Sequence, residues 1–307
     1  MTTDLNIAAY GEGILYPPNL ATNMTAMQQA GWTSLMVSLF QVDRAGDITF
    51  NGNAIISNGN YVGDSTWPSQ LAQLKSTGTI ETLLATFGGW DSAFQNIQDI
   101  YNGNNNSFAG TALQANCTVF RATFPAFDLI DMDVEYPDGM PTNATACFIA
   151  FCEMWIEAGF GITFCPYQDM PFWTAALVTI EQNHPGAVKW WNLQCYAGGQ
   201  GNNPSDWARA ITKALPNFNT NGYILSSDWT RFWNSQDNAW EGDCPAAVES
   251  LLSSFRGEAC VGGGFIWTID QIIDYAAETK INPDPGNCGN VGMTDYVNAI
   301  VNGLKPS

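Results

Sequence analysis

The sequence predicts an α/β protein, a single (β/α)8 TIM barrel spanning residues 1–307. Eight apolar, β-like runs alternate with helix-like stretches, and such alternation implies parallel strands joined by right-handed crossovers. Eight such units in 307 residues match the usual size of a closed barrel. The alternative is a doubly wound open sheet, which usually carries a Gly-rich phosphate loop after an early strand. The segment YGEG at 10–13 is too short for that loop and is not followed by a helix.

The expected strands, in order, are 5–10, 34–42, 80–87, 127–135, 161–167, 188–196, 221–229 and 261–267. Helices expected between them include 20–30, 68–77, 92–101, 143–158, 171–183, 205–214 and 244–255. Capping residues support three of these helices, namely Asp91, Asn143 and Pro204–Ser205. Because the active sites of such barrels lie at the carboxyl ends of the strands, the last residues of each run are the candidate site positions.

The composition limits the possible partners. Hydrophobic residues make up 46% of the chain and charged residues 13%, so a large core is expected. No apolar run reaches the roughly 18 residues of a membrane-spanning helix. Acidic residues outnumber basic ones 29 to 10, for a net charge of −19. Such a surface repels nucleic-acid phosphates and anionic lipids but not a neutral sugar, so we expect neither nucleic acid nor membrane as partner. We also expect a monomer.

Cysteines and sequons favour a secreted, extracellular glycoprotein. The eight cysteines form no CxxC pair; Cys165 and Cys195 lie in apolar runs that suit buried thiols, and the others could form disulfides of open connectivity. Asn-x-Ser/Thr sequons begin at Asn23, Asn105, Asn116 and Asn143. The start, MTTDLN, lacks the features of a secretory signal, so a signal has been removed or never existed. The one histidine, His184, suits a helix end, and a His-based triad or zinc site is not expected.

The stretch FDLIDMDVEYPDG, 127–139, places Asp131, Asp133 and Glu135 at alternate positions. In a strand these side chains share one face, spaced about 6.6–6.8 Å apart. Three interpretations compete: a half-exposed strand, a calcium loop, or paired acid catalysis. A calcium loop needs glycine at its sixth position, where this chain has Tyr136. In a barrel the acids would face the interior, where burying like charges is costly and is kept mainly for chemistry or metal binding.

The catalytic interpretation assigns a donor. A carboxyl group among like charges has a raised pKa and can hold a proton near neutral pH. Glu135 is nearest the end of the strand, so it is the expected proton donor, with Asp133 and Asp131 behind it. No metal and no cofactor is expected.

Four motifs in order along the chain resemble glycoside hydrolase family 18, which includes chitinases and endo-β-N-acetylglucosaminidases. The Asp-x-x-Asp-x-Asp-x-Glu signature is similar to Asp128, Asp131, Asp133 and Glu135. Further similar segments are TFGGW (86–90), QCY (194–196) and GGGFIWTID (262–270), and Tyr10 stands where a first-strand aromatic lines the site. The chain departs from the family pattern at Leu129, Thr86 and Ala197, and the last of these loses a polar ligand contact.

The resemblance implies a retaining, substrate-assisted hydrolase. Glu135 would be the general acid and base, Asp133 would orient the acetamido N–H, and Asp131 would share a proton with Asp133. Tyr196 would hold the acetamido oxygen. The remaining implied substrate-binding residues are Trp267, Tyr10, Gln194, Trp90 and Gly89. Asp128 falls on the opposite face of the strand from Asp131, Asp133 and Glu135, so it is expected to be structural.

The resemblance implies, as the main expectation, endo-cleavage of β-1,4-linked N-acetylglucosamine polymers such as chitin. Two alternatives stay open: an endo-β-N-acetylglucosaminidase acting on N-glycan cores, and a non-hydrolytic, lectin-like barrel. Only about 35 residues separate the last two strand ends, so we expect a barrel without a large α+β insertion and with an open cleft.

Overall fold

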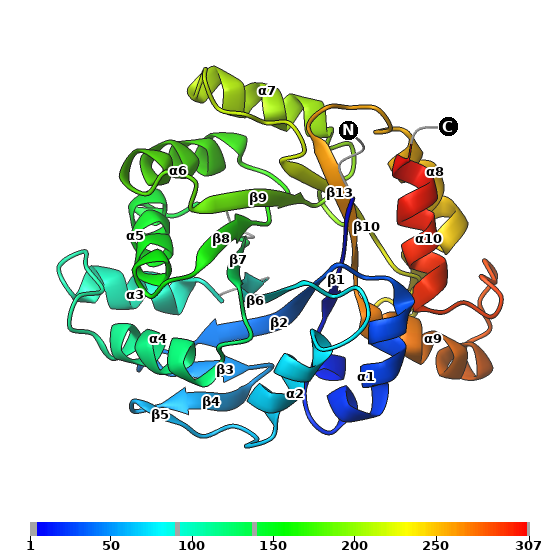
Figure 1. Ribbon diagram of the computed structural model, residues 1–307, viewed down its shortest axis with the longest axis horizontal. Coiled ribbons are helices and arrows are strands. Elements are labelled where there is room, and N and C mark those ends of the chain that lie inside the picture. The colour runs from blue at the N-terminus through cyan, green and yellow to red at the C-terminus, as the bar shows by residue number, and fades with distance from the viewer. Residues whose placement is uncertain (1–4, 90–92, 137–139, 306–307) are drawn as a thin grey trace.

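Eight parallel strands close into a barrel in the computed structural model, which describes residues 5–89, 93–136 and 140–305. The strands are β1 (Asn6–Gly11), β2 (Ser34–Val42), β6 (Thr82–Gly89), β7 (Leu129–Val134), β8 (Gly161–Phe164), β9 (Val188–Leu193), β10 (Ile224–Trp229) and β13 (Val261–Trp267). They pair in the order β1-β13-β10-β9-β8-β7-β6-β2, and a β1–β2 pairing closes the ring (Figure 1). The predicted (β/α)8 barrel is confirmed.

Helices surround the barrel on its outside (Figure 1). They are η1 (Gly13–Leu15), α1 (Asn19–Ala30), α2 (Trp67–Leu74), α3 (Gln95–Gly103), α4 (Ala112–Thr123), α5 (Ala144–Glu157), α6 (Met170–Asn183), α7 (Pro204–Ala214), α8 (Pro245–Ser253), α9 (Ile269–Ile281) and α10 (Met293–Leu304). The seven helices named from the sequence are all present, with ends shifted by a few residues. As expected, His184 caps the carboxyl end of α6, and its N–H donates to the Ile180 carbonyl.

Two predicted N-caps differ in how they work. Helix α7 begins at Pro204, and the Asn203 side chain accepts the N–H of Ser205 at 2.8 Å, so Asn203 is the capping residue. Asn143 stands at the N-cap of α5, but its backbone has a φ of +65° and its side chain makes no capping hydrogen bond. Asp91 lies outside the described residues.

Two small antiparallel additions extend the barrel. Strands β3 (Ile48–Phe50), β4 (Asn53–Ser57) and β5 (Asn60–Tyr61) continue the sheet from the end of β2. Strands β11 (Phe232–Asn234) and β12 (Ala239–Glu241) form a separate hairpin between β10 and α8. Since only this hairpin and α8 separate β10 from β13, the predicted lack of a large insertion is confirmed.

The barrel strands divide the core into two layers. Alternate residues of each strand point inward, where the buried lumen cluster contains Ala8, Tyr10, Met36, Leu84, Leu129, Cys165, Tyr196, Leu225 and Phe265. The residues on the opposite face of each strand pack under the helices in a much larger cluster, which is rich in phenylalanine and tryptophan. This division decides which way each side chain of the acidic strand points.

The structure contains one disulfide within the described residues, Cys244–Cys288, with sulfurs joined across 44 positions of sequence. Cys165 and Cys195 are buried thiols, as expected, and the remaining four cysteines are also free and buried. Among the sequons, Asn116 is 1% exposed, and its amide donates to the Gly46 carbonyl at 2.8 Å. A glycan cannot reach Asn116 in the folded chain. The prediction of a glycan at this sequon is therefore wrong, and Asn116 is a structural residue.

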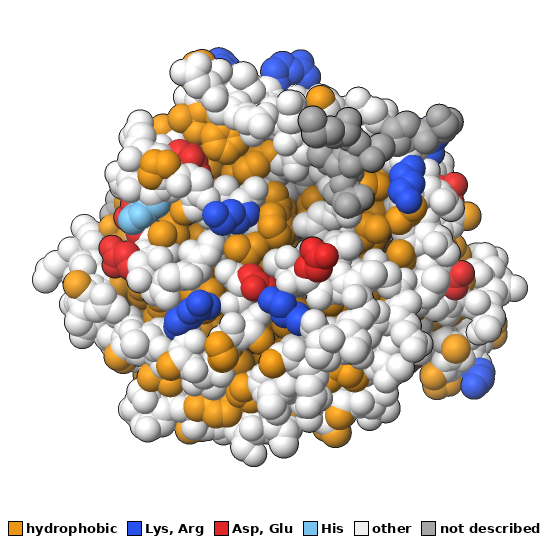
Figure 2. All heavy atoms as spheres, in the orientation of Figure 1, with side chains coloured by type: hydrophobic (Ala, Val, Ile, Leu, Met, Phe, Trp, Pro, Cys, Tyr) orange, Lys and Arg blue, Asp and Glu red, His pale blue; other side chains and the backbone are white. Residues whose placement is uncertain are grey.

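The face of the molecule in Figure 2 carries basic and acidic side chains close to each other, and uncharged atoms make up most of it. None of the helices in residues 5–89, 93–136 and 140–305 combines the length and the apolar character that crossing a bilayer requires.

Candidate active site

The acidic strand β7 turns its carboxylates into the barrel. Ile130, Met132 and Val134 belong to the outer core layer, so the opposite parity faces the lumen. Asp131 is completely buried and Asp133 is 3% exposed. The half-exposed-strand interpretation is therefore wrong, because neither aspartate meets bulk solvent.

Asp131 lies at the bottom of the site, where four side chains donate to it. Its Oδ2 accepts the hydroxyl groups of Tyr10 at 2.7 Å and Thr86 at 3.2 Å. Its Oδ1 accepts Thr163 Oγ1 at 2.6 Å and Asn192 Nδ2 at 2.9 Å. Burial raises the pKa of Asp131, and these four hydrogen bonds oppose that rise. Among the described residues no hydrogen bond joins Asp131 to Asp133, and the expected sharing of a proton between them stays a prediction.

Glu135 is the next carboxyl group along the chain from Asp133. Gln194 Nε2 lies 3.2 Å from both Asp133 Oδ1 and Glu135 Oε1, so it bridges the two side chains. Burial, followed by the neighbouring negative charge of Glu135, raises the pKa of Asp133 well above its usual value. Burial also raises the pKa of Glu135, while Gln194 and Asp133 oppose that rise. The pair therefore retains a proton at higher pH than two isolated carboxyls would.

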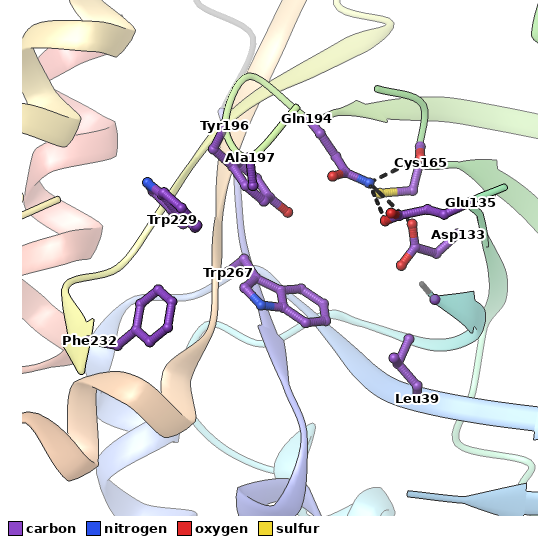
Figure 3. Close-up of a pocket in the computed structure, with 11 residues that line it drawn as sticks. Leu39, Asp133, Glu135, Cys165, Gln194, Tyr196, Ala197, Trp229, Phe232 and Trp267 are labelled. Carbon is purple, nitrogen blue, oxygen red and sulfur yellow. Dashed lines mark hydrogen bonds between the residues drawn. The ribbon is translucent and has the colours of Figure 1, made fainter. Parts of the chain in front are cut away.

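A cavity of about 400 Å³ opens above this carboxyl pair. Its lining residues are Leu39, Gly89, Asp133, Glu135, Cys165, Gln194, Tyr196, Ala197, Trp229, Phe232 and Trp267. Figure 3 shows the two carboxyls and Gln194 on one side, Trp229 and Phe232 on the other, and Tyr196 and Trp267 between them. The Tyr196 and Trp229 rings stack at 6.0 Å with an interplanar angle of 20°. The cavity thus combines apolar ring faces with a protonatable wall.

Glycines at the end of β6 allow the acidic strand to approach. Gly88 has a φ of +127°, and a Cβ there would lie 1.8 Å from the carbonyl oxygen of Asp133. At Gly89, with a φ of +97°, a Cβ would lie 2.6 Å from Leu39 Cδ1. Both positions need a conformation and a closeness that other residues do not tolerate. The Gly-Gly pair of the TFGGW motif therefore lets β6 lie against the end of β7 that carries Asp133.

The structure brings together six of the nine predicted site residues as cavity walls: Glu135, Asp133, Tyr196, Trp267, Gln194 and Gly89. The expectation that Tyr10 binds substrate is corrected, because Tyr10 is completely buried beneath the cavity and its hydroxyl contacts Asp131. Asp131 itself lies below the cavity surface. Trp90 lies outside the described residues.

Asp128 lies apart from these groups, as expected. Its carboxylate accepts Lys75 Nζ at 2.7 Å and the Leu83 backbone N–H at 2.9 Å. Thr86, a departure from the family motif, keeps the hydroxyl that reaches Asp131. Leu129 packs close to Gly161, where an added Cβ would meet Leu129 Cδ2 at 2.6 Å.

Sequence reasoning missed several cavity walls as site residues. Trp229 was a strand-end candidate, but nothing in the sequence distinguished it from a core tryptophan. Phe232 belongs to the unpredicted β11–β12 hairpin, and Leu39 lies inside the expected strand 34–42 rather than at its end. Cys165 was assigned as a buried thiol; it is 1% exposed yet borders the cavity, and it accepts the Tyr10 hydroxyl at 3.1 Å.

The site has the parts for proton transfer to and from a bound neutral ligand. Two neighbouring carboxyls with raised pKa values can donate a proton and take one back. Flat aromatic rings suit the apolar faces of sugar rings. Within the described residues, no group of three or more His, Cys, Asp or Glu side chains is arranged to hold a metal ion. The fold and the site together define a (β/α)8 barrel with an acid–base cavity at the carboxyl ends of its strands.

Solved structures of similar fold are chitinases and related lytic enzymes. A GH18 chitinase from Pseudoalteromonas aurantia matches with a TM-score of 0.62 and 12% identity, over 97% of this chain and 100% of that one. The GH18 chitinase ChiB from the chitin utilization locus of Flavobacterium johnsoniae matches with a TM-score of 0.60 and 11% identity, over 97% and 94%.

The spore cortex-lytic enzyme SleL of Bacillus megaterium matches with a TM-score of 0.54 and 11% identity, over 98% of this chain and 74% of that one. No protein-family profile and no curated protein matches the sequence. At these identities the likeness is one of fold: this chain has the barrel fold of the GH18 chitinases over nearly its whole length.

Proposed function

We propose that the protein is a family 18 glycoside hydrolase of the chitinase type, which cleaves β-1,4 linkages within N-acetylglucosamine polymers. The observation that carries the proposal is the Asp133–Glu135 pair, bridged by Gln194 and facing an aromatic cavity. The shared barrel fold and the four sequence motifs support it. A neutral polymer also suits a chain with a net charge of −19, which would repel an anionic substrate.

In the proposed reaction, Glu135 donates its proton to the glycosidic oxygen as the bond to the anomeric carbon breaks. The carbonyl oxygen of the substrate's own 2-acetamido group attacks that carbon and forms a cyclic oxazolinium ion. Asp133 accepts a hydrogen bond from the acetamido N–H and stabilises the positive charge, while Tyr196 holds the acetamido oxygen. Glu135 then deprotonates a water molecule, which opens the ring with overall retention of configuration.

The placement of the two carboxyls favours substrate assistance over an enzymic nucleophile. Retaining enzymes with a carboxylate nucleophile hold the two groups about 5–5.5 Å apart, and inverting enzymes hold them about 6.5–9.5 Å apart. Asp133 and Glu135 instead lie side by side on one wall, where Gln194 donates to both. Asp133 is therefore better placed to contact the acetamido group than to attack the anomeric carbon. A thiazoline analogue of the oxazolinium intermediate should inhibit; insensitivity to it would contradict this mechanism.

Two further properties belong to the proposal. The protein acts as a monomer, and it is secreted, since the Cys244–Cys288 disulfide suits an oxidising compartment. The exposed sequon positions Asn105 and Asn143 could then carry glycans.

The central test is Glu135→Gln, assayed on chromogenic N-acetylglucosamine oligomers. Loss of the proton donor should lower kcat about 10²- to 10⁴-fold. Glu12→Gln is the matched control, because Glu12 is also a partly buried acid whose burial raises its pKa to about 7, and it does not line the cavity. A wild-type protein that is inert on chitin oligomers and on N-glycan cores would contradict hydrolysis and favour the lectin-like alternative. Faster release from a glycoprotein than from chitin would favour the endo-β-N-acetylglucosaminidase.

A further inference from the structure

A second, smaller pocket adjoins the catalytic cavity. The β11–β12 hairpin and helix α9 enclose about 120 Å³, lined by Phe232, Trp233, Trp240, Gln271, Asp274, Tyr275 and Glu278. Phe232 lines both this hairpin pocket and the catalytic cavity. A ligand that leaves the cavity past Phe232 would therefore enter the hairpin pocket directly.

Both pockets contain pairs of neighbouring aromatic rings. Trp229, in the cavity, lies 5.7 Å from Phe232, measured between ring centroids. Beyond Phe232, the Trp233 and Trp240 rings lie 5.8 Å apart, and Trp240 lies 5.4 Å from Tyr275. Trp233 and Trp240 are half-buried, so each keeps part of its surface free. Rings of this kind stack on the C–H faces of pyranose sugars.

Polar groups border the rings along helix α9. Gln271 uses its carbonyl oxygen to accept the Thr230 hydroxyl at 2.7 Å, which leaves its NH₂ group as a donor. Asp274 is exposed, and no group among the described residues donates a hydrogen bond to its carboxylate. Carboxylates beside an aromatic surface suit hydroxyl and amide N–H donors, which an amino-sugar chain carries on its edges. A purely apolar partner would leave these groups without a role.

The hairpin pocket is held in place before any ligand binds. Arg231 forms an ion pair with Asp284 at 2.8 Å, and the Trp240 indole N–H donates to the Asn282 carbonyl at 3.1 Å. The Cys244–Cys288 disulfide ties the residue before α8 to the same 282–292 loop. Such preorganisation reduces the entropy that a ligand would lose on binding.

We infer that the hairpin pocket is a further sugar subsite, which holds a distal unit of the amino-sugar chain that occupies the catalytic cavity. This inference rests on the proposed function for the identity of the chain. The unit stacks on Trp233, and Gln271 and Asp274 hydrogen-bond to its edge. The short hairpin thus extends the binding surface that an otherwise minimal barrel offers.

The test is a calorimetric titration of the Glu135→Gln protein with β-1,4-linked N-acetylglucosamine oligomers of increasing length, which measures the affinity for each length. Affinity should rise once an oligomer is long enough to reach from the cavity past Phe232. In the same background, Trp233→Ala should remove this rise. The affinity for the longest oligomer should fall about three- to tenfold, and the affinity for the shortest should not change. Phe218→Ala is the matched control: Phe218 packs on Tyr223, just before the amino end of β10, and it should change neither.

The outcomes separate this inference from the proposed function. Equal weakening of all lengths, or no change, in Trp233→Ala would overturn the subsite even if the wild-type protein hydrolyses chitin. A wild-type protein that is inert but shows the Trp233-dependent rise would overturn hydrolysis and support the subsite. If circular dichroism shows that Trp233→Ala does not fold, Asp274→Asn decides instead: the side chain is exposed, so folding is unaffected, and the same selective loss for long oligomers is expected.

Discussion

The hydroxyl group of Tyr10, on β1, donates a 2.7 Å hydrogen bond to Oδ2 of Asp131, on β7, across the inside of the barrel. Both side chains are completely buried. Thr86, Thr163 and Asn192 supply further donors from β6, β8 and β9. Asp131 therefore joins strands from around the barrel beneath the Asp133–Glu135 pair, and these contacts fix the position of β7.

Tyr10→Phe tests this structural role. It removes one donor from a buried carboxylate and should destabilise the protein by about 1.5–3 kcal/mol, since hydrogen bonds to charged groups are the stronger kind. Tyr223→Phe is the matched control, because the Tyr223 hydroxyl donates to the neutral Val188 carbonyl at 3.1 Å and should cost about 0.5–1.5 kcal/mol. Chemical denaturation measures both. Equal losses in the two variants would mean that Asp131 gains nothing special from Tyr10.

The pH dependence of activity should follow the Asp133–Glu135 pair as a unit. The pair must keep one proton for catalysis, and the negative charge on each carboxyl makes that last proton harder to remove. Asp133→Asn eliminates the like charge, so the alkaline limb of the kcat/KM profile should move to lower pH. The rate at the optimum should also fall about 10²-fold or more as the acetamido contact weakens. An alkaline limb that stays in place would show that Asp133 does not control the proton on Glu135.

The sequence predicted the barrel because apolar runs and helical stretches alternate strongly. Strands 34–42 and 261–267 match their observed bounds, and the parity argument correctly turned Asp131 and Asp133 inward. The face of the strand on which a residue lies does not show how far below the cavity its side chain sits. The family resemblance gave Tyr10 as a ligand contact, although the Tyr10 ring fits between the lumen side chains below the cavity.

The hairpin escaped prediction for a different physical reason. Strands β11 and β12 have three residues each, all half-buried, so they show no clear alternation of apolar and polar side chains. Contacts from α9 and the 282–292 loop, distant in sequence, hold the hairpin. Phe232, a wall of both pockets, was missed with it. Tertiary contacts, rather than local pattern, make that part of the site.

Gly88→Ala should disrupt the contact between β6 and β7, the strand that carries Asp131 and Asp133. The added Cβ would lie 1.8 Å from the Asp133 carbonyl, and the backbone has a φ of +127°. Gly159→Ala separates the steric clash from the strain of a positive φ, because Gly159 has a φ of +93° with no atom within 4 Å of the added Cβ. We expect Gly159→Ala to cost about 1–2 kcal/mol of stability from strain alone, and Gly88→Ala to cost more and to abolish activity. Thermal unfolding and hydrolysis assays check this; a fully active Gly88→Ala protein would contradict the close approach.

Asp228 should make the protein less stable as pH rises towards neutrality. It is 2% exposed, its Oδ2 is buried without a hydrogen-bond partner, and burial followed by the charge of Asp243 raises its pKa to about 7. A raised folded-state pKa means that the folded chain holds a proton which the unfolded chain has lost, so this stabilisation is complete below about pH 4 and disappears as pH rises to about 7. Asp228→Asn removes the titration and supplies an amide that can donate towards Asp243. It should increase stability above pH 7 by as much as about 4 kcal/mol and change it little at pH 4. Denaturant unfolding at both pH values measures the difference, with the exposed Asp237→Asn as the control that should be flat. Equal effects at the two pH values would show that Asp228 is already ionised in the folded protein.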